Sequence, residues 1–258
     1  MERRPADRRG SIRRVTRFAV FSDIHGNLPA LKACHADALA QGCDTFLNLG
    51  DILSGPLWPA ETAEWLMARN WPTIAGNHER QVLTLPAERM GETDRLTRSL
   101  LAETHLCWID SLPATLALPG LFLCHGTPES DITHFLFDVD DGRLVEAREG
   151  EITARLGNVD APLTLCGHTH VARSVTLTDG RRVANAGSVG LQAYSDDHPE
   201  PYIVENGDPL ARYLVVEHGR VDVRSVAYDC RAAADRAAAL GRPDWAHALM
   251  TGKLPLTR

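Results

Sequence analysis

Five short segments of the sequence carry residues that can bind metal ions. They are SDIHGN (22–27), LGD (49–51), AGNHE (75–79), CHG (124–126) and CGHTH (166–170). In each, an apolar run typical of a β-strand ends in one or two residues from Asp, Asn and His beside a glycine. Ligands of open α/β sheets collect at the carboxyl ends of the strands, so we expect these loops to meet at one point.

The side chains in these segments suit a hard or borderline divalent metal. Two carboxylates, one amide and four imidazoles are candidate ligands: Asp23, His25, Asp51, Asn77, His125, His168 and His170. Imidazole suits zinc or iron, oxygen ligands suit manganese or magnesium, and no thiolate is among them. Seven ligands exceed the needs of one ion, and a carboxylate can bridge two ions about 3.5–4 Å apart. The set therefore predicts a dinuclear site.

Each segment also has an ordinary structural interpretation when it is taken alone. The Asp-Ile-His sequence can cap a strand, Gly-Asp is common in loops, and Gly-Asn-His favours a turn. The Gly-His-Thr-His sequence can be an exposed strand end. All five in this order, each after a strand-like run, favour one shared site.

Alternating strands and helices must position these loops. Strands are expected at 17–22, 45–49 and 72–75, with helices at 29–41 and 60–69, and 79–112 is expected to be mainly helical. From 114 onward the pattern changes to short strands punctuated by Gly and Pro, with a helix near 143–156 and terminal helices within 229–250. The order predicts an α/β protein with one domain at 17–258, preceded by a disordered basic tail at 1–16.

Composition excludes several classes of protein. The formal charge of the 258 residues is −7, which argues against binding of duplex nucleic acid through a basic face. Two divalent ions would nevertheless outweigh two aspartates and attract a phosphate. No apolar stretch approaches the roughly 20 residues of a membrane span. The six cysteines include no CxxC pair, and Cys124 and Cys166 end apolar runs, so we expect reduced thiols and a cytoplasmic protein.

The series DxH, GD, GNHE, H and GHTH resembles the calcineurin-like metallophosphoesterase superfamily, and its compact form resembles the small bacterial and archaeal phosphodiesterase branch. The resemblance covers about residues 18–228. It implies a metallophosphoesterase fold, a four-layer α/β/β/α sandwich of two mixed β-sheets flanked by helices. The glutamate after His78, where many relatives have aspartate, is a mild departure.

The resemblance also implies a role for each candidate residue. Asp23, His25 and His170 would bind the first metal, Asn77, His125 and His168 would bind the second, and Asp51 would bridge the two. Manganese is the expected metal, with iron, zinc or nickel as alternatives. A hydroxide that bridges the ions would attack phosphorus in line, and His78 would face the substrate and assist.

Several alternatives stay open at this point. A phosphodiesterase acting on a small, nucleotide-derived phosphoester is favoured, and a phosphomonoesterase or a dinucleoside polyphosphate hydrolase would use the same site. A non-catalytic interaction scaffold of the same fold is less favoured because every ligand is present. A homodimer is an expectation from the resemblance.

Residues outside the five segments are expected to be mainly structural. His134, Asn185 and Ser188 are weaker candidates for substrate contact. The remaining histidines are expected on the surface or on helices: His35, His105, His198, His218 and His247. Three tryptophans are expected in the core: Trp58, Trp65 and Trp71.

Overall fold

A sheet with parallel and antiparallel strand pairs contains the N-terminal strand. The computed structural model describes residues 17–256. The strands of this first sheet are β1 (Arg17–Phe21), β2 (Thr45–Asn48), β12 (Ala211–Glu217) and β13 (Arg220–Val226), in the order β13-β12-β1-β2. β1 and β2 are parallel, with Phe21 opposite Asn48, so the two strands end together and their following loops are neighbours.

A second mixed sheet supplies the remaining loops of the site. Its strands are β3 (Thr115–Leu118), β4 (Leu121–Cys124), β7 (Leu163–Cys166), β8 (Arg173–Thr176) and β9 (Arg182–Asn185), in the order β3-β4-β7-β9-β8. β4 and β7 are parallel neighbours. The loops that carry His125 and the CGHTH segment therefore leave the same edge of this sheet.

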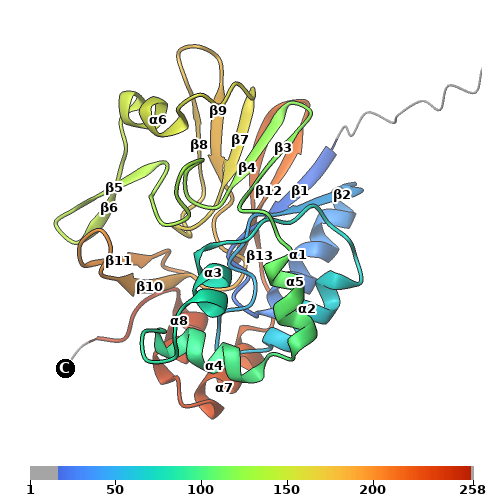
Figure 1. The fold of residues 1–258 in the computed structure, drawn as a ribbon, viewed down its shortest axis with the longest axis vertical. Helices are drawn as coiled ribbons and strands as arrows, with labels where there is room; N and C mark the ends of the chain where they lie inside the picture. Colours follow the sequence, from blue (N-terminus) through green and yellow to red (C-terminus); the bar gives the residue numbers. More distant parts are fainter. Residues whose placement is uncertain (1–16, 257–258) are drawn as a thin grey trace, which may run out of the picture.

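The described residues contain eight helices and a further small sheet (Figure 1). The helices are α1 (Leu28–Ala40), α2 (Pro59–Met67), α3 (Asn77–Thr84), α4 (Glu92–Leu100), α5 (Glu103–Asp110), α6 (Glu149–Leu156), α7 (Cys230–Ala239) and α8 (Pro243–Thr251). The small sheet has the order β10-β11-β6-β5, with β10 (Ala193–Asp196), β11 (Tyr202–Glu205), β6 (Arg143–Glu146) and β5 (Phe137–Asp140).

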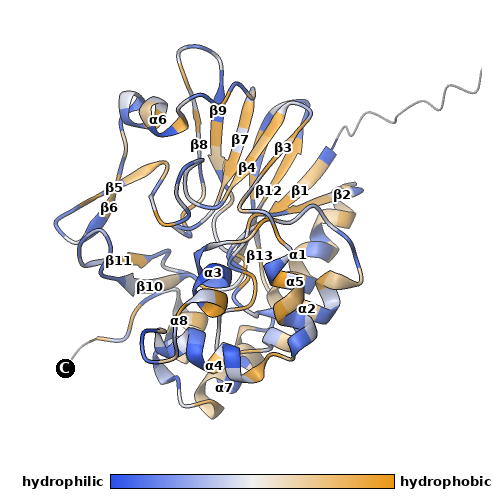
Figure 2. Cartoon of the chain, in the orientation of Figure 1, coloured by the Kyte–Doolittle hydropathy of each residue, from blue (hydrophilic) through white to orange (hydrophobic). Residues whose placement is uncertain are grey.

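Side-chain alternation along β1 determines where the core lies. Successive residues of a strand face opposite sides of the sheet. Ala19 and Phe21 pack against buried residues of α1, α2 and α5, whereas Phe18 and Val20 pack against strands β4 and β7 of the second sheet. α6 packs on the second sheet through Ile152. Figure 2 shows the apolar residues concentrated in the strands of both sheets.

The structure confirms the α/β class with mixed sheets and corrects two expected elements. Residues 72–75 are not a strand: Thr73 makes a single bridge to Asn48, Pro72 has no N–H to donate, and the Ala75 N–H is bonded to Pro113 O. The expected helix at 143–156 begins only at Glu149.

Residues before that helix form a hairpin. β5 and β6 are joined by Asp141 and Gly142, which both have positive φ, as a two-residue hairpin turn requires. The Asp-Gly pair is a hairpin signal that the analysis of the sequence overlooked. The two strands are needed because β6 pairs with β11 and so completes the small sheet.

Other expectations have mixed outcomes. Cys124 and Cys166 are buried free thiols, as expected. The basic tail at 1–16 lies outside the described residues. Within the described part of the chain, no helix combines the length and apolar character that crossing a membrane would require.

Candidate metal centre

The first group of candidate ligands connects the loop after β1 with the loop after β7. Asp23, His25 and His170 are all buried, and their ligand atoms lie within 4.8 Å of one another. His170 Nε2 is 3.3 Å from Asp23 Oδ1 and 3.0 Å from His25 Nε2. These three side chains can hold one metal ion.

Asp51, His125 and His168 form a second buried group. His125 Nε2 is 3.1 Å from Asp51 Oδ2 and 3.9 Å from Asp23 Oδ1, so the two groups adjoin. Asn77, the remaining candidate, begins α3, and the N–H of the next residue donates to Asp51 Oδ1 at 3.0 Å. The structure thus brings all seven predicted ligands into one region.

Backbone carbonyls fix the orientation of every imidazole in the two groups. One ring nitrogen of each donates to a carbonyl: His25 Nδ1 to Ser54 O (2.7 Å), His125 Nδ1 to Leu49 O (2.7 Å), His170 Nδ1 to Leu191 O (2.8 Å) and His168 Nε2 to Ile132 O (3.0 Å). A neutral imidazole carries one N–H, so the other nitrogen of each ring offers a lone pair. Histidines that bind metals are held by the same kind of bond.

This arrangement fits bound cations. His25 Nε2 and His170 Nε2 lie 3.0 Å apart, each with its lone pair if the ring is neutral, and only a positive charge between them makes that approach favourable. Asn77 Oδ1 and His125 Nε2 are buried without a hydrogen-bond partner, since the approach of His125 to Asp51 lacks hydrogen-bond geometry. Unpaired buried polar atoms are costly unless a ligand satisfies them.

Burial and the neighbouring carboxylates together set the protonation of the imidazoles. Burial, together with the neighbouring His170, lowers the pKa of His25 to about 4, and burial lowers that of His168 to about 3. Both rings are therefore neutral at pH 7, the form that binds metals. Although burial also opposes the charged form of His125, the carboxylates of Asp51 and Asp23 raise its pKa to about 10. A proton on His125 and a metal cation therefore compete for the same carboxylates.

The backbone of the site is strained. Among the described residues, eight residues other than glycine have positive φ, and five of them are predicted ligands: Asp23, His25, Asp51, His168 and His170. This left-handed region is unfavourable for such residues and typically persists where the surrounding structure enforces it, often at functional sites. The loops are thus held in shapes that aim the side chains inward.

Two glycines permit the close approach of the loops. A Cβ on Gly167 would lie 1.9 Å from Ser22 Oγ, and a Cβ on Gly76 would lie 2.2 Å from Asp51 Oδ1. Neither position can accept a side chain without a shift of the metal-binding loops.

Glu79 connects two of the loops from beneath the site. Its buried carboxylate accepts hydrogen bonds from the N–H groups of Asp51 and Ile52, both at 2.8 Å, and from Gly76 at 2.9 Å. It therefore fixes the loop that carries Asp51 relative to the start of α3. From sequence, this residue is only a departure from the family pattern, whereas the structure gives it a positioning role.

His78 is held by a carboxylate that the sequence analysis missed. His78 Nδ1 donates to Asp94 Oδ1 at 2.7 Å, and Ser54 Oγ donates to the same oxygen at 2.5 Å. The other ring nitrogen, Nε2, lies 4.0 Å from Asp51 Oδ2. Although burial opposes the charged form, Asp51 and Asp94 raise the pKa of His78 to about 10. Asp94 lies in α4, beyond any of the five segments, so no local pattern marks it.

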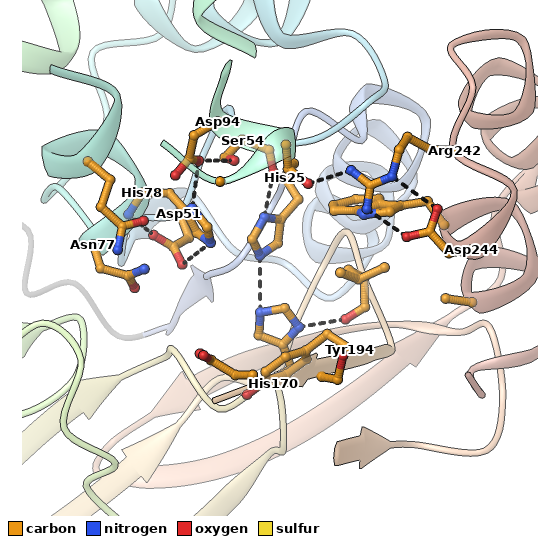
Figure 3. A pocket seen from close by; sticks show the side chains of 18 of the residues that line it. His25, Asp51, Ser54, Asn77, His78, Asp94, His170, Tyr194, Arg242 and Asp244 are labelled. Carbon is orange, nitrogen blue, oxygen red and sulfur yellow. Dashed lines mark hydrogen bonds and ion pairs between the residues drawn. The ribbon is translucent and has the colours of Figure 1, made fainter. Parts of the chain in front are cut away.

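Both groups open onto a cavity of about 420 Å³. Figure 3 shows Asp51, Asn77 and His78 on one side of His25, with Arg242 and Asp244 on the other. The residues of the two groups and of α3 that line the cavity are His25, Asp51, Asn77, His78, Gln81, His168 and His170. A ligand in this cavity can therefore contact both groups.

The weaker candidates do not line this cavity. His134 is buried, and its Nε2 lies 3.0 Å from the hydroxyl of Tyr202. Asn185 donates to Thr169 Oγ1, and Ser188 donates to the Asp23 carbonyl, so both brace the metal-binding loops. The three tryptophans belong to the hydrophobic clusters, as expected: Trp58, Trp65 and Trp71.

Comparisons with known proteins give consistent results. The sequence profile of the family described as Calcineurin-like phosphoesterase matches residues 16–172. The uncharacterized protein MJ0912 of Methanocaldococcus jannaschii is 25% identical over 250 residues, which cover 88% of this chain and 94% of that protein.

Two solved structures share the fold. A metallophosphoesterase from Sphaerobacter thermophilus has a TM-score of 0.73 and 24% identity, with 92% of this chain and 99% of that chain covered. Protein PH1004 from Pyrococcus horikoshii has a TM-score of 0.71 and 18% identity, with 93% and 99% covered.

The positioning role of Glu79 leads to the first prediction. In Glu79→Gln an amide N–H₂ would face backbone N–H groups whose hydrogen bonds the carboxylate now accepts, and two donors cannot bond to each other. We expect metal affinity to fall about 10- to 100-fold, as for other residues that support metal ligands, which equilibrium dialysis against Mn²⁺ would measure. Glu88→Gln, the same change at an exposed position, is the control. Equal affinities in both variants would contradict the role.

Proposed function

Because the chain belongs to the calcineurin-like phosphoesterase family, we propose that it is a phosphodiesterase that works with two divalent metal ions. The chain is a metallophosphoesterase with two buried His/Asp groups that can bind metal. The observation that carries the proposal is that both groups open onto one cavity. A phosphate ester in that cavity can meet both ions at once.

The proposed ligands follow the two groups. Asp23, His25 and His170 would hold one ion, Asn77, His125 and His168 the other, and Asp51 would bridge them. The bridging role is supported by the place of Asp51 between Asn77 and His25 in Figure 3. Manganese is the proposed metal because the set mixes oxygen and imidazole ligands, and iron, zinc and nickel accept similar sets.

The chemistry at the leaving group is assigned to His78. When bound, the two ions supply an activated water nucleophile and neutralise the non-bridging oxygens of the phosphate. Asp94 accepts from His78 Nδ1, so Nε2 is the nitrogen that can face a substrate. Since Asp51 and Asp94 favour the protonated ring, His78 can donate from Nε2 to a phosphoryl oxygen or to the departing oxygen.

The shape of the cavity supports a diester rather than a monoester. The cavity continues from the metal-binding groups to α8, where Arg242, Trp245 and Ala248 line it. A diester carries a second ester group that can occupy this part. A monoester would leave it to water.

The layering of the fold belongs to the same proposal. We infer a four-layer α/β/β/α sandwich. The packing of β1 against β4 and β7, with α1 beyond the first sheet and α6 beyond the second, supports this arrangement.

Metal removal and reconstitution tests the proposed function. The stripped protein should hydrolyse neither bis(p-nitrophenyl) phosphate nor p-nitrophenyl phosphate. Added Mn²⁺ should restore cleavage of the diester preferentially, and Ni²⁺, Zn²⁺ and Mg²⁺ are compared in parallel. Preference for the monoester would contradict the phosphodiesterase assignment. Absence of activity with every metal, with fewer than two ions bound per chain, would favour a scaffold.

The role of His78 gives a separate prediction. In His78→Ala, kcat for the diester should fall about 10²- to 10⁴-fold because a general acid is lost, while two ions per chain stay bound. His247→Ala, which removes an exposed histidine from α8, is the matched control. Wild-type turnover in His78→Ala would remove His78 from the mechanism, and loss of metal would make it a structural residue.

Asp94 should act through His78 alone. In Asp94→Asn the imidazole loses its carboxylate partner, and we expect kcat to fall about 10- to 100-fold with little change in KM. The double variant His78→Ala/Asp94→Asn should be no slower than His78→Ala, because neighbouring residues that act as a unit are not additive. Additive losses in the double variant would show that Asp94 has an independent role.

A further inference from the structure

The cavity beside the metal-binding groups has one apolar side. Six residues of this side come from β10 with its preceding loop and from α8 with its following segment: Leu191, Ala193, Tyr194, Trp245, Ala248 and Leu254. We call them the aromatic wall. α3 contributes polar side chains to the rest of the lining, among them His78 and Gln81.

The aromatic wall lies outside the part of the chain that carries the metal ligands. The family profile ends at residue 172, and all seven ligands precede that point. The wall begins at Leu191. The chemistry of phosphate cleavage and the recognition of the rest of the substrate can therefore be assigned to different parts of the chain.

The two aromatic rings of the wall stand beside the first metal-binding group. The Trp245 ring centroid is 6.0 Å from that of His25, with an interplanar angle of 73°. The Tyr194 ring centroid is 4.6 Å from that of His170. An ester group next to a phosphate at the metals would therefore lie within reach of these rings.

Hydrogen bonds fix the wall in place. Arg242 makes a bidentate ion pair with Asp244, at 3.0 and 2.6 Å (Figure 3). Its Nη1 also donates to Thr93 Oγ1 at 2.6 Å, and this bond connects the start of α8 to α4. The Tyr194 hydroxyl lies 3.2 Å from that of Tyr202 in β11. The charge of Arg242 is thus balanced by Asp244, so this guanidinium need not be satisfied by an anionic ligand.

We propose that the aromatic wall binds the ester group that stays on the phosphate, and that this group is planar and aromatic, as in an aryl ester or a nucleoside. The inference rests on the proposed phosphodiesterase function. A flat ring can pack against Trp245 and Tyr194, and its polar edge can face polar lining residues such as Gln81. Trp245 is buried except where it lines the cavity, and an alkyl group of one or two carbons would contact less of the two rings than an aromatic ring would.

Three diesters with the same leaving group test this assignment. They are methyl, phenyl and thymidine-5′ p-nitrophenyl phosphate, assayed with the Mn²⁺-loaded protein. Since aromatic stacking strengthens binding, KM of the wild type should be about tenfold lower for the phenyl ester than for the methyl ester. A low KM for the thymidine ester as well would show that the aromatic wall also binds nucleosides. A low KM for the phenyl ester alone would show that it binds only simple aryl groups.

Substitution of Trp245 tests whether its indole causes the preference for the phenyl ester over the methyl ester. In Trp245→Leu the phenyl-to-methyl preference should fall to about twofold or less, because stacking is lost. Trp65→Leu, which removes an indole from α2 outside the cavity, is the matched control and should keep the wild-type ratio. A wild-type preference below twofold, or a folded Trp245→Leu variant with the wild-type ratio, would overturn the proposal.

Binding measurements test the aromatic wall without relying on activity or on the folding of the Trp245→Leu variant. Calorimetry with the metal-loaded wild type should find phenylphosphonate bound about tenfold more tightly than methylphosphonate. Equal binding would overturn the aromatic wall. If none of the three esters is hydrolysed, the proposed function fails, and the comparison of phosphonates still decides the wall.

Discussion

The structure depends on one constraint: four buried imidazoles lie against two buried aspartates and against one another. Each ring is fixed by a hydrogen bond to a backbone carbonyl, and His25 Nε2 meets His170 Nε2 at 3.0 Å. Without cations such a cluster is unfavourable, because buried ligand atoms lack partners. Five of the ligands also occupy the left-handed backbone region. The rest of the fold must therefore stabilise these loops, and bound metal would add to the free energy of folding.

The fold meets this constraint by ending parallel strands together. β1 and β2 in one sheet and β4 and β7 in the other carry their loops to adjoining edges, and hydrogen bonds join the two sheets where His168 N–H donates to Asp23. Glu79 then connects the loop of Asp51 to α3 from beneath. The strands are apolar on both faces because each sheet packs on the other and on helices. A rigid, buried base for the ligands is the result.

The clustering of the candidate ligands could be predicted from sequence because each one follows an apolar run beside a glycine, and the ends of parallel strands bring such positions together. The same pattern predicted the α/β class and most strand positions, whereas the mixed sheets were expected only from the family resemblance. Asp94, Tyr194 and Trp245 escaped prediction, since they lie on elements whose own patterns carry no sign of the cavity. The hairpin of β5 and β6 was missed although Asp141-Gly142 signals it. The expected strand at 72–75 is reduced to one bridge between Thr73 and Asn48, because the Ala75 N–H is bonded to Pro113 O and not to β2.

Electron paramagnetic resonance of the protein loaded with two equivalents of Mn²⁺ tests whether two metal ions share one site. If Asp51 bridges the ions about 3.5–4 Å apart, the spectrum should be that of a magnetically coupled pair. The variant Asp51→Asn should lose the coupling. A wild-type spectrum of two isolated Mn²⁺ ions, or binding of only one equivalent, would contradict a shared site.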